Sequence, residues 1–154
     1  MATGLARHCI EVANKYATDR VAFGKPIREF GQIQKHLAES YARYMSSRTY
    51  LYHVAGKMDL EKEGQRLDTD GVKLVCTTMG KDVADNCMQS ALISLPYLLE
   101  LKKCAHAVHV VTVLGGAGYI NDFAIERMWR DAKLLEIGGG TLESVRAFHR
   151  PPLQ

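Results

Sequence analysis

Apolar side chains recur every three or four positions along most of this 154-residue chain, which is the spacing of one face of an α-helix. One such stripe runs from Ala2 to Ala17, and a longer one runs from Phe30 to Met58. A third stripe carries Val72, Val75, Met79, Val83 and Cys87, and a fourth carries Phe123, Met128, Ala132 and Leu135. A final short helix is expected at 141–148. The pattern predicts an all-α fold.

Polar and helix-breaking residues mark the ends of the predicted helices. Gly24 and Pro26 interrupt the pattern after the first stripe, and the charged segment 59–70 separates the second stripe from the third. Asn121 and Asp122 have side chains that can cap a following helix. We therefore expect a loop after the first helix, a solvated linker at 59–70, and a helix that starts after Asp122.

Composition and charge narrow the class of protein. The chain is 47% hydrophobic and 24% charged, which is typical of one ordinary globular domain. Its net charge of +3 comes from dispersed Lys and Arg, so no nucleic-acid partner is expected. No apolar run reaches the ~18 to 20 residues of a membrane helix. The 4 cysteines show no C-x-x-C pairing and no obvious disulfide spacing, and no targeting signal is visible.

Two glycine-rich stretches are the strongest candidates for a binding site. The first contains Gly115, Gly116 and Gly118, and the second runs from Gly138 to Thr141. Glycine lets the backbone approach a ligand closely, and a Thr that caps a helix leaves N–H groups pointing outward. These residues predict a backbone cradle for an anionic or polar cofactor.

The predicted loop at 19–27 is a second candidate. Gly24 and Pro26 break the helix there and leave Arg20 and Lys25 close to the ring of Phe23. Such a loop can hold a phosphate group. The residues alone favour the simpler alternative, a turn between two helices with solvated charges.

Four stretches together resemble a known family. They are 115–119 (GGAGY), 126–133 (ERMWRDAK), 137–141 (IGGGT) and 20–27 (RVAFGKPI). They resemble the C-terminal domain of the acyl-CoA dehydrogenases, and the sequence around Gly139 resembles that of the isovaleryl-like branch. The resemblance implies an up-and-down four-helix bundle, FAD as cofactor, oxidation of the CH–CH group of an acyl-CoA, and a homo-oligomer, which is a tetramer in the family. It also implies the mitochondrial matrix for a eukaryotic chain and the cytoplasm for a bacterial one.

The resemblance also implies which residues contact the flavin. It places Arg20 on the pyrophosphate and Phe23 beside the cofactor. It adds Thr141 and Glu143 at the second glycine stretch. The full set implied as cofactor-binding is Arg20, Phe23, Gln89, Gly115, Gly116, Thr141 and Glu143. The family often has a glutamine that reaches the neighbouring subunit's flavin where this chain has Gly31.

The catalytic base of the family is not found in this chain. Many members place a glutamate at the position of Gly139, and the isovaleryl-like branch takes its glutamate from a helix position that would fall before Met1. Glu11, Glu136 and Glu143 match neither position, and surface or cap roles are preferred for them, so no catalytic residue is assigned. We expect the natural beginning to lie upstream, which makes the chain a C-terminal fragment that binds acyl-CoA only when completed by missing domains. The alternative is a non-catalytic bundle for subunit association with full-length relatives; an acyl-CoA oxidase ranks below both.

One segment departs from the family. Residues 84–89 would join 113–116 directly, so the single domain 1–154 is expected to carry an insertion at 90–112, either a retained intron or a lineage-specific insertion. Within it, Cys104, His106 and His109 have a spacing that allows a zinc site. A fourth ligand is not apparent, so exposed helix residues are the preferred interpretation and no metal is assigned.

Overall fold

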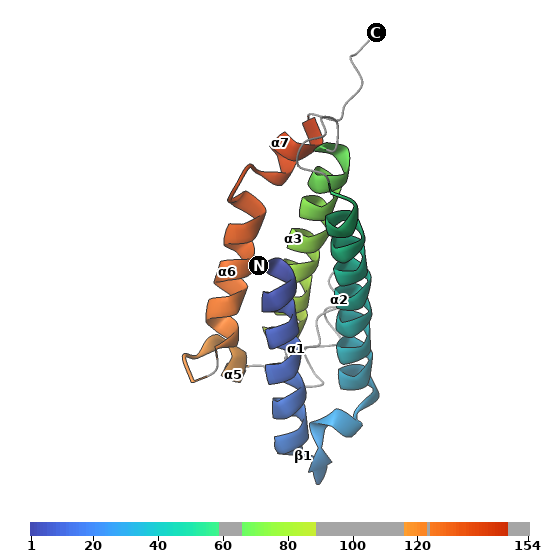
Figure 1. Ribbon diagram of the computed structural model, residues 1–154. Helices are drawn as coiled ribbons and strands as arrows, with labels where there is room; N and C mark the ends of the chain where they lie inside the picture. The colour runs from blue at the N-terminus through green and yellow to red at the C-terminus, as the bar shows by residue number, and fades with distance from the viewer. Residues whose placement is uncertain (59–65, 89–115, 123, 148–154) are drawn as a thin grey trace, which may run out of the picture.

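Four helices run up and down beside one another (Figure 1). The computed structural model describes residues 1–58, 66–88, 116–122 and 124–147. The helices are α1 (Ala2–Asp19), α2 (Gly31–Lys57), α3 (Arg66–Met88), α5 (Gly116–Tyr119), α6 (Ile125–Ile137) and α7 (Leu142–Ala147). A hairpin of β1 (Val21–Ala22) and β2 (Lys25–Pro26), followed by a 3-10 helix at Ile27–Glu29, joins α1 to α2. The all-α, up-and-down four-helix bundle predicted from the sequence is confirmed, with α1, α2, α3 and α6 as its members.

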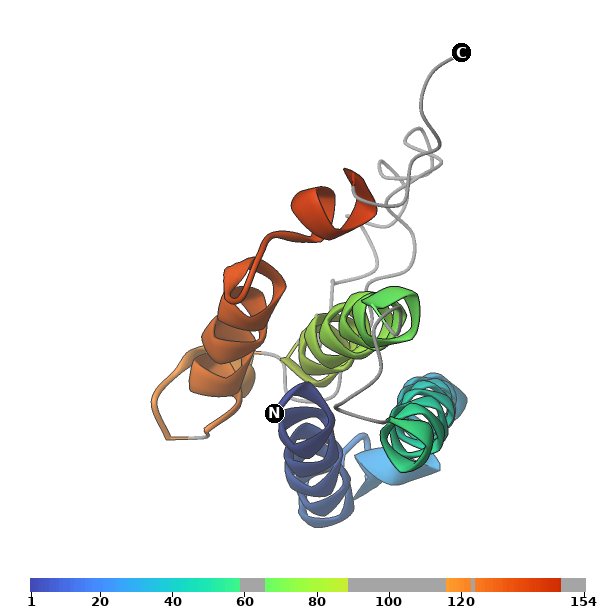
Figure 2. The same ribbon diagram turned by 45° about the horizontal axis from the view of Figure 1, so that its top comes forward.

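The helix α3 lies at the centre of the packing. It contacts α1, α2 and α6, and Figure 2 shows it between α2 and α6 with α1 alongside. The short helix α7 contacts α3 and crosses the end of the bundle at which α3 begins, whereas the hairpin and α5 lie at the other end (Figure 1). The two ends of the bundle therefore carry different segments of the chain.

Small side chains fill the contact between α1 and its neighbours. The buried face of α1 consists of Ala2, Ala6, Cys9, Ala13 and Ala17. Across from it, an added Cβ on Gly80 would lie 3.2 Å from the Cβ of Ala2, which is closer than most side-chain contacts. The larger buried side chains Val83 and Ile125 complete the core from α3 and α6. The stripe predicted for the first helix is thus confirmed as a core face, and its small residues let α1 and α3 approach closely.

Polar contacts fix how the helices are aligned. The indole Nε1 of Trp129 on α6 donates to Asp85 Oδ1 on α3 at 3.0 Å. On the other side of α3, Arg43 Nη1 of α2 lies 3.2 Å from Asp82 Oδ2. The thiol of Cys76 donates to the carbonyl oxygen of Ser47 at 3.6 Å. Each contact joins α3 to a different partner or a different level of the bundle, so rotation of α3 about its axis is restricted.

Three local predictions need correction. The helix α3 begins at Arg66, inside the segment predicted as a linker, where Asp68 in the first turn favours a helix start. Asn121 and Asp122 form a turn, which their side chains also favour, and α6 starts later with Ala124 as an N-cap that makes no side-chain hydrogen bond. On α3, Val75 is 44% exposed and its neighbour Cys76 is buried instead.

Some predictions concern residues that the structure does not describe. The predicted insertion at 90–112, with Cys104, His106 and His109, lies outside them, as does Phe123. Among the described helices, none combines the length and apolar character that a transmembrane span requires.

Candidate functional site

The hairpin after α1 is formed by a two-residue turn with an unusual backbone. The strands pair antiparallel, with Val21 opposite Pro26 and Ala22 opposite Lys25, which leaves Phe23 and Gly24 as the turn. Both turn residues have positive φ, 53° at Phe23 and 80° at Gly24. Tight hairpins require this conformation, and glycine adopts it readily, whereas a phenylalanine there is rare. The turn therefore holds an aromatic side chain in a backbone conformation that costs free energy.

The side chains of the hairpin combine an exposed ring with positive charge. Phe23 is 78% exposed, and its ring meets Phe30 edge-on at 6.2 Å between centroids. The Lys25 ammonium lies 4.6 Å from the centroid of the Phe30 ring. Arg20 is exposed, and its carbonyl oxygen accepts a hydrogen bond from the N–H of Ile27 at 2.9 Å. The hairpin thus presents a guanidinium, an ammonium and a ring to solvent.

The second glycine stretch forms the turn between α6 and α7. The N–H of Gly138 donates to the carbonyl oxygen of Leu134 at 2.7 Å and closes α6. Gly139 and Gly140 follow with φ of 71° and 99°. These values lie in the left-handed region that favours glycine, so the sequence of three glycines is what allows the chain to reverse here.

Thr141 caps the helix that follows this turn. The N–H of Ser144 donates to Thr141 Oγ1 at 3.2 Å, and the N–H of Val145 donates to the carbonyl oxygen of Thr141 at 3.0 Å. Glu143 is exposed in the first turn of α7. Leu142 and Val145 are buried and hold α7 against the bundle. The capping role predicted for Thr141 is confirmed by this geometry.

A side chain that the sequence did not indicate contacts the glycine turn. Lys73 Nζ, on α3, donates to the carbonyl oxygen of Gly138 at 2.7 Å and also to that of Gly140. The lysine is separated from these glycines by 65 and 67 positions in sequence. It belongs to no recognisable motif, so only the fold could reveal the contact.

The structure does not bring the expected flavin contacts into one place. The hairpin with Arg20 and Phe23 lies at one end of the bundle, and Thr141 and Glu143 lie at the other (Figure 1). Gly116, at the start of α5, lies at the hairpin end, separated from Thr141 by the 13 residues of α6. At 1.5 Å per residue that helix spans about 20 Å. The two glycine stretches therefore do not form one continuous cradle; Gln89 and Gly115 lie outside the described residues.

Two of the carboxylates that match no base position, Glu11 and Glu136, are engaged in ion pairs. Glu11 Oε1 accepts a hydrogen bond from Arg7 Nε at 2.8 Å, and this bond is the main cause that lowers the pKa of Glu11. Glu136 Oε2 lies 2.7 Å from Lys133 Nζ. A general base needs a pKa near the working pH, so the lowered pKa makes Glu11 a weak candidate. Among the described residues, no three metal-ligating side chains gather into a possible metal site.

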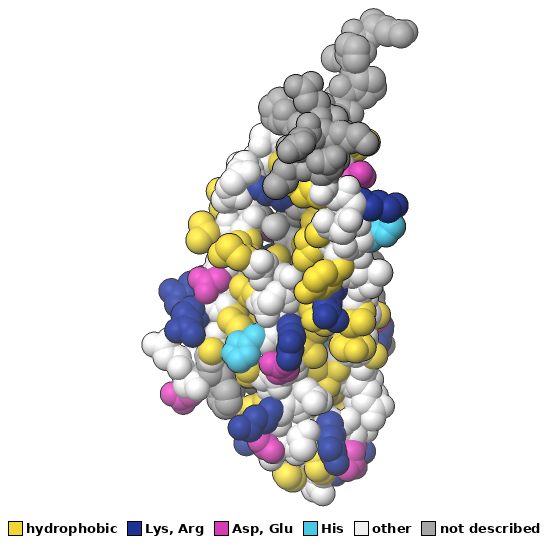
Figure 3. Space-filling model, viewed as in Figure 1, with side chains coloured by type: hydrophobic (Ala, Val, Ile, Leu, Met, Phe, Trp, Pro, Cys, Tyr) yellow, Lys and Arg dark blue, Asp and Glu magenta, His cyan; other side chains and the backbone are white. Residues whose placement is uncertain are grey.

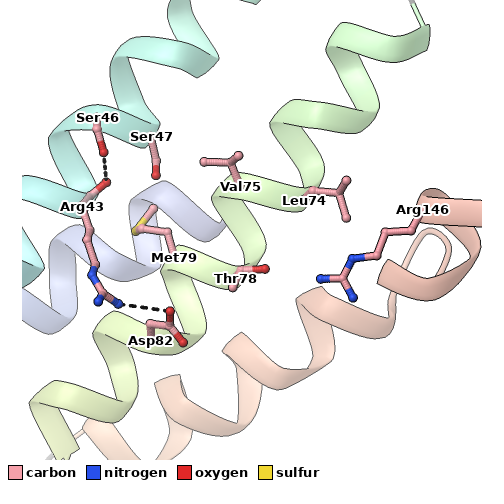
Figure 4. Close-up of a pocket in the computed structure, with 9 residues that line it drawn as sticks. All are labelled: Arg43, Ser46, Ser47, Leu74, Val75, Thr78, Met79, Asp82 and Arg146. Carbon is pink, nitrogen blue, oxygen red and sulfur yellow. Dashed lines mark hydrogen bonds and ion pairs between the residues drawn. The ribbon is translucent and has the colours of Figure 1, made fainter. Parts of the chain in front are cut away.

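An open groove of about 500 Å³ lies between α2 and α3 beside α7 (Figure 4). Its lining residues are Arg43, Ser46, Ser47, Leu74, Val75, Thr78, Met79, Asp82 and Arg146. Asp82 is the one carboxylate among them, and it is paired with Arg43. Figure 4 shows Arg146 reaching from α7 toward α3. Of the described residues that are expected to contact the flavin, none lines this groove.

Comparison with known proteins identifies the family. The family model for the C-terminal domain of acyl-CoA dehydrogenases matches residues 1–91 and 102–148 of this sequence. The unmatched residues between these two parts, 92–101, fall within the segment 90–112 in which the sequence predicts an insertion.

Individual relatives agree with this match. Mitochondrial isovaleryl-CoA dehydrogenase of Oryza sativa subsp. japonica is 39% identical over 140 residues, covering 91% of this chain and 28% of the relative. The protein of the same name from Bos taurus is 37% identical over 140 residues, covering 91% of this chain and 27% of the relative. Butyryl-CoA dehydrogenase from Megasphaera elsdenii superposes with a TM-score of 0.72 at 26% identity, covering 95% of this chain and 32% of that structure. This chain therefore belongs to the acyl-CoA dehydrogenase family, and it matches the family's C-terminal domain.

Proposed function

We propose that this chain supplies the C-terminal helical domain of an FAD-dependent acyl-CoA dehydrogenase, an oxidoreductase that acts on the CH–CH group of an acyl-CoA thioester. The chain spans about 28% of the curated relatives that it matches. Both curated relatives described above are named isovaleryl-CoA dehydrogenases, which favours a short branched acyl chain as substrate. Because no carboxylate of this chain matches a base position, we expect no turnover from the chain alone. For a eukaryotic chain, the mitochondrial names of these relatives support a mitochondrial location.

The observation that carries the proposal is the chemistry of the hairpin. Arg20 and Lys25 are exposed cations beside the exposed ring of Phe23. A guanidinium binds a diphosphate through two parallel hydrogen bonds, and an exposed aromatic ring can pack on a planar heterocycle. This set of donors fits a flavin dinucleotide, and when bound the flavin would supply the acceptor for the hydride that leaves the substrate.

The second end of the bundle offers a different set of groups. Thr141 and Glu143 are exposed beside the glycine turn, where Gly139 and Gly140 have positive φ and no side chain of their own to cover the backbone. A hydroxyl and backbone N–H groups can donate hydrogen bonds to the oxygen and nitrogen atoms at the polar edge of a ring system. We assign this end to the flavin ring and the hairpin end to the pyrophosphate.

The distance between the two ends favours an oligomer. One α6 helix of about 20 Å separates them, and the hairpin lies on the other side of the bundle axis from α6 (Figures 1 and 2). We therefore propose that each flavin contacts the hairpin of one copy and the glycine turn of another. This arrangement makes the homo-oligomer a condition for a complete cofactor site.

Flavin binding tests the proposal directly. FAD is titrated into the purified chain and its fluorescence quenching is followed for the unaltered protein, for Arg20→Met and for Arg28→Met. Arg28 is an exposed arginine of the neighbouring 3-10 helix and serves as the matched control. We expect Arg20→Met to weaken binding about tenfold, since a charge-assisted bond is lost, and Arg28→Met to bind normally. Equal affinities for all three proteins, or no binding by the unaltered chain, would count against the proposal.

Mixing of two variants tests the shared site. Arg20→Met removes the hairpin contact and Thr141→Ala removes the contact at the glycine turn, so each variant alone should bind FAD weakly. When the two are unfolded together and refolded as mixed oligomers, some sites pair an intact Arg20 with an intact Thr141, and we expect part of the tight binding to return. A mixture that binds no better than either variant would show that both contacts belong to one copy.

A second candidate is a non-catalytic bundle that associates with full-length relatives. The observation in its favour is the exposure of large apolar side chains on several helices, and Figure 3 shows such side chains gathered over α2 and beside it. The most exposed on the four bundle helices are Tyr41, Tyr52, Leu67, Leu134 and Ile137. Monomers rarely leave large apolar patches uncovered. Light scattering coupled to gel filtration would show a colourless oligomer without flavin affinity if this function is the correct one.

A further inference from the structure

We infer that Lys73 is a positioning residue, which holds the glycine turn after α6 in one conformation and so sets the orientation of Thr141 and Glu143 toward the cofactor. The inference rests on the proposed flavin site. No motif contains Lys73, and its contact with the turn arises only from the packing of α3 beside α6.

The turn is a part of the chain that needs such a restraint. Gly139 and Gly140 both have positive φ, and glycine loses more conformational entropy than other residues when it is fixed in one state. Two backbone hydrogen bonds flank the turn. The N–H of Gly138 closes α6 before it, and the carbonyl oxygen of Thr141 accepts from the N–H of Val145 after it. Between these two points, the ammonium of Lys73 holds the backbone.

The carbonyl groups at this helix end match the ammonium electrostatically. The last carbonyl groups of a helix lack partners within it and carry partial negative charge. Lys73 Nζ donates to the carbonyl oxygens of Gly138 and Gly140, so one cation bridges the two sides of the turn. An added Cβ on Gly139 would lie 3.6 Å from the same Nζ, which shows that the ammonium lies directly against the turn.

The helix that carries Lys73 is itself held in place by the bundle. Lys73 lies on α3 between the glycine turn and the buried side chains Met79 and Val83 further along the helix. Its own carbonyl oxygen accepts a hydrogen bond from Thr77 Oγ1 at 2.7 Å. Because α3 packs on three other helices, Lys73 transfers the rigidity of the core to a turn that has no large side chain of its own.

Thr141 is the residue through which the restraint reaches the site. It follows Gly140 directly. Its Oγ1 accepts a hydrogen bond from the N–H of Ser144, and its carbonyl oxygen accepts one from the N–H of Val145. A turn that samples several conformations would move Thr141 and would leave these two amides unbonded for part of the time. Protection of the Ser144 and Val145 amides therefore reports on the restraint by Lys73, and it does so without any flavin.

The test compares Lys73→Met and Lys73→Arg with a control on the same helix, Lys81→Met. Lys81 lies about two turns further along α3, and its ammonium is 4.0 Å from Asp82, far from the glycine turn. Amide hydrogen exchange of Ser144 and Val145, FAD affinity and the midpoint of urea unfolding are measured for each. We expect Lys73→Met to exchange about tenfold faster at both amides and to bind FAD about tenfold more weakly. Lys73→Arg should restore most of both, and Lys81→Met should change neither.

Three outcomes would overturn the inference. Unchanged exchange at Ser144 and Val145 in Lys73→Met would show that the ammonium does not hold the turn. Faster exchange with unchanged FAD affinity would show a structural role without effect on the site. A weaker affinity that Lys73→Arg does not restore would show that the loss does not come from the bonds of the cation to the turn. If the unaltered chain binds no FAD, the proposed function fails together with the cofactor part of the inference, whereas the exchange data still decide whether Lys73 holds the turn.

Discussion

Individual glycines differ in whether the fold requires them, and their backbone φ angles distinguish the two cases. Gly139 has φ of 71°, whereas Gly56 lies in α2 with nothing within 4 Å of an added Cβ. The first position needs glycine for its backbone conformation. The second bears a side chain freely, so glycine there only weakens the helix.

Alanine at each of these positions should therefore change stability in opposite directions. We expect Gly139→Ala to lower the free energy of unfolding by about 1 to 2 kcal/mol, because alanine is strained at positive φ. Gly56→Ala should raise it by about 0.5 to 1 kcal/mol through helix propensity. Urea unfolding followed by circular dichroism measures both. A neutral or stabilising Gly139→Ala would contradict the left-handed conformation of the turn.

Phe23 also has a positive φ, although it is not a glycine. Its φ of 53° is unfavourable for phenylalanine, yet its ring is 78% exposed and is not needed for the core. Strain that persists at an exposed side chain is more common at functional sites than elsewhere. The conformation is consistent with a ring that is retained for binding.

Two substitutions at Phe23 separate strain from ring chemistry. Asparagine tolerates positive φ and leucine does not, while both remove the ring. We expect Phe23→Asn to be about 1 kcal/mol more stable than Phe23→Leu, and both to bind FAD more weakly than the unaltered chain. Thermal unfolding and FAD titration provide the two measurements. Equal stability of the two variants would mean that the hairpin relaxes to another turn.

At the scale of the elements, hydrophobic periodicity predicted the helices well and their ends less well. The stripe from Ala2 to Ala17 became the buried face of α1, because a helix between two others must bury its apolar face. The start of α6 was missed, since Asn121 and Asp122 favour a turn as much as a cap. The strands β1 and β2 were not predicted, because two residues each are too few to show an alternating pattern.

The candidate site was predictable only where a local motif marks it. The resemblance named Arg20, Phe23 and Thr141 from short motifs, and the hairpin turn and the helix cap give these residues a local structural context. Lys73 was not predictable, because its contact spans 65 residues of sequence and depends on how α3 lies beside α6. Sequence order also suggested that both glycine stretches share one cradle, and the length of α6 separates them.

At the scale of the whole molecule, buried thiols link stability to alkaline pH. Burial raises the pKa of the Cys9 thiol to about 12, and it also raises the pKa of Cys87, with a smaller contribution from nearby Cys9. In the unfolded chain the pKa of each thiol is about 8.5. The folded state thus holds its thiol protons at pH values at which the unfolded chain loses them. This contribution to stability is complete below about pH 8.5 and declines as the pH rises toward about 12.

The variant Cys9→Ala tests this dependence. The free energy of unfolding is measured by urea titration between about pH 8 and about pH 10.5 for the variant and the unaltered chain. We expect the unaltered chain to lose stability more steeply, by up to about 1.4 kcal/mol per pH unit for this one thiol, although alanine leaves a small cavity that lowers both ends of the curve. Parallel curves would show that Cys9 ionises as easily in the folded chain as in the unfolded one.

The helix α6 ends at the glycine turn, and its length has a consequence for how this part of the chain can change. One added or deleted residue in a helix shifts the downstream backbone by about 1.5 Å and rotates it by about 100°. The contact of Lys73 with Gly138 and Gly140 would then be lost, even though every side chain near it kept its identity. Evolutionary change in α6 is therefore expected to proceed through substitutions on its exposed face, such as at Arg127 or Leu134, and not through changes in its length.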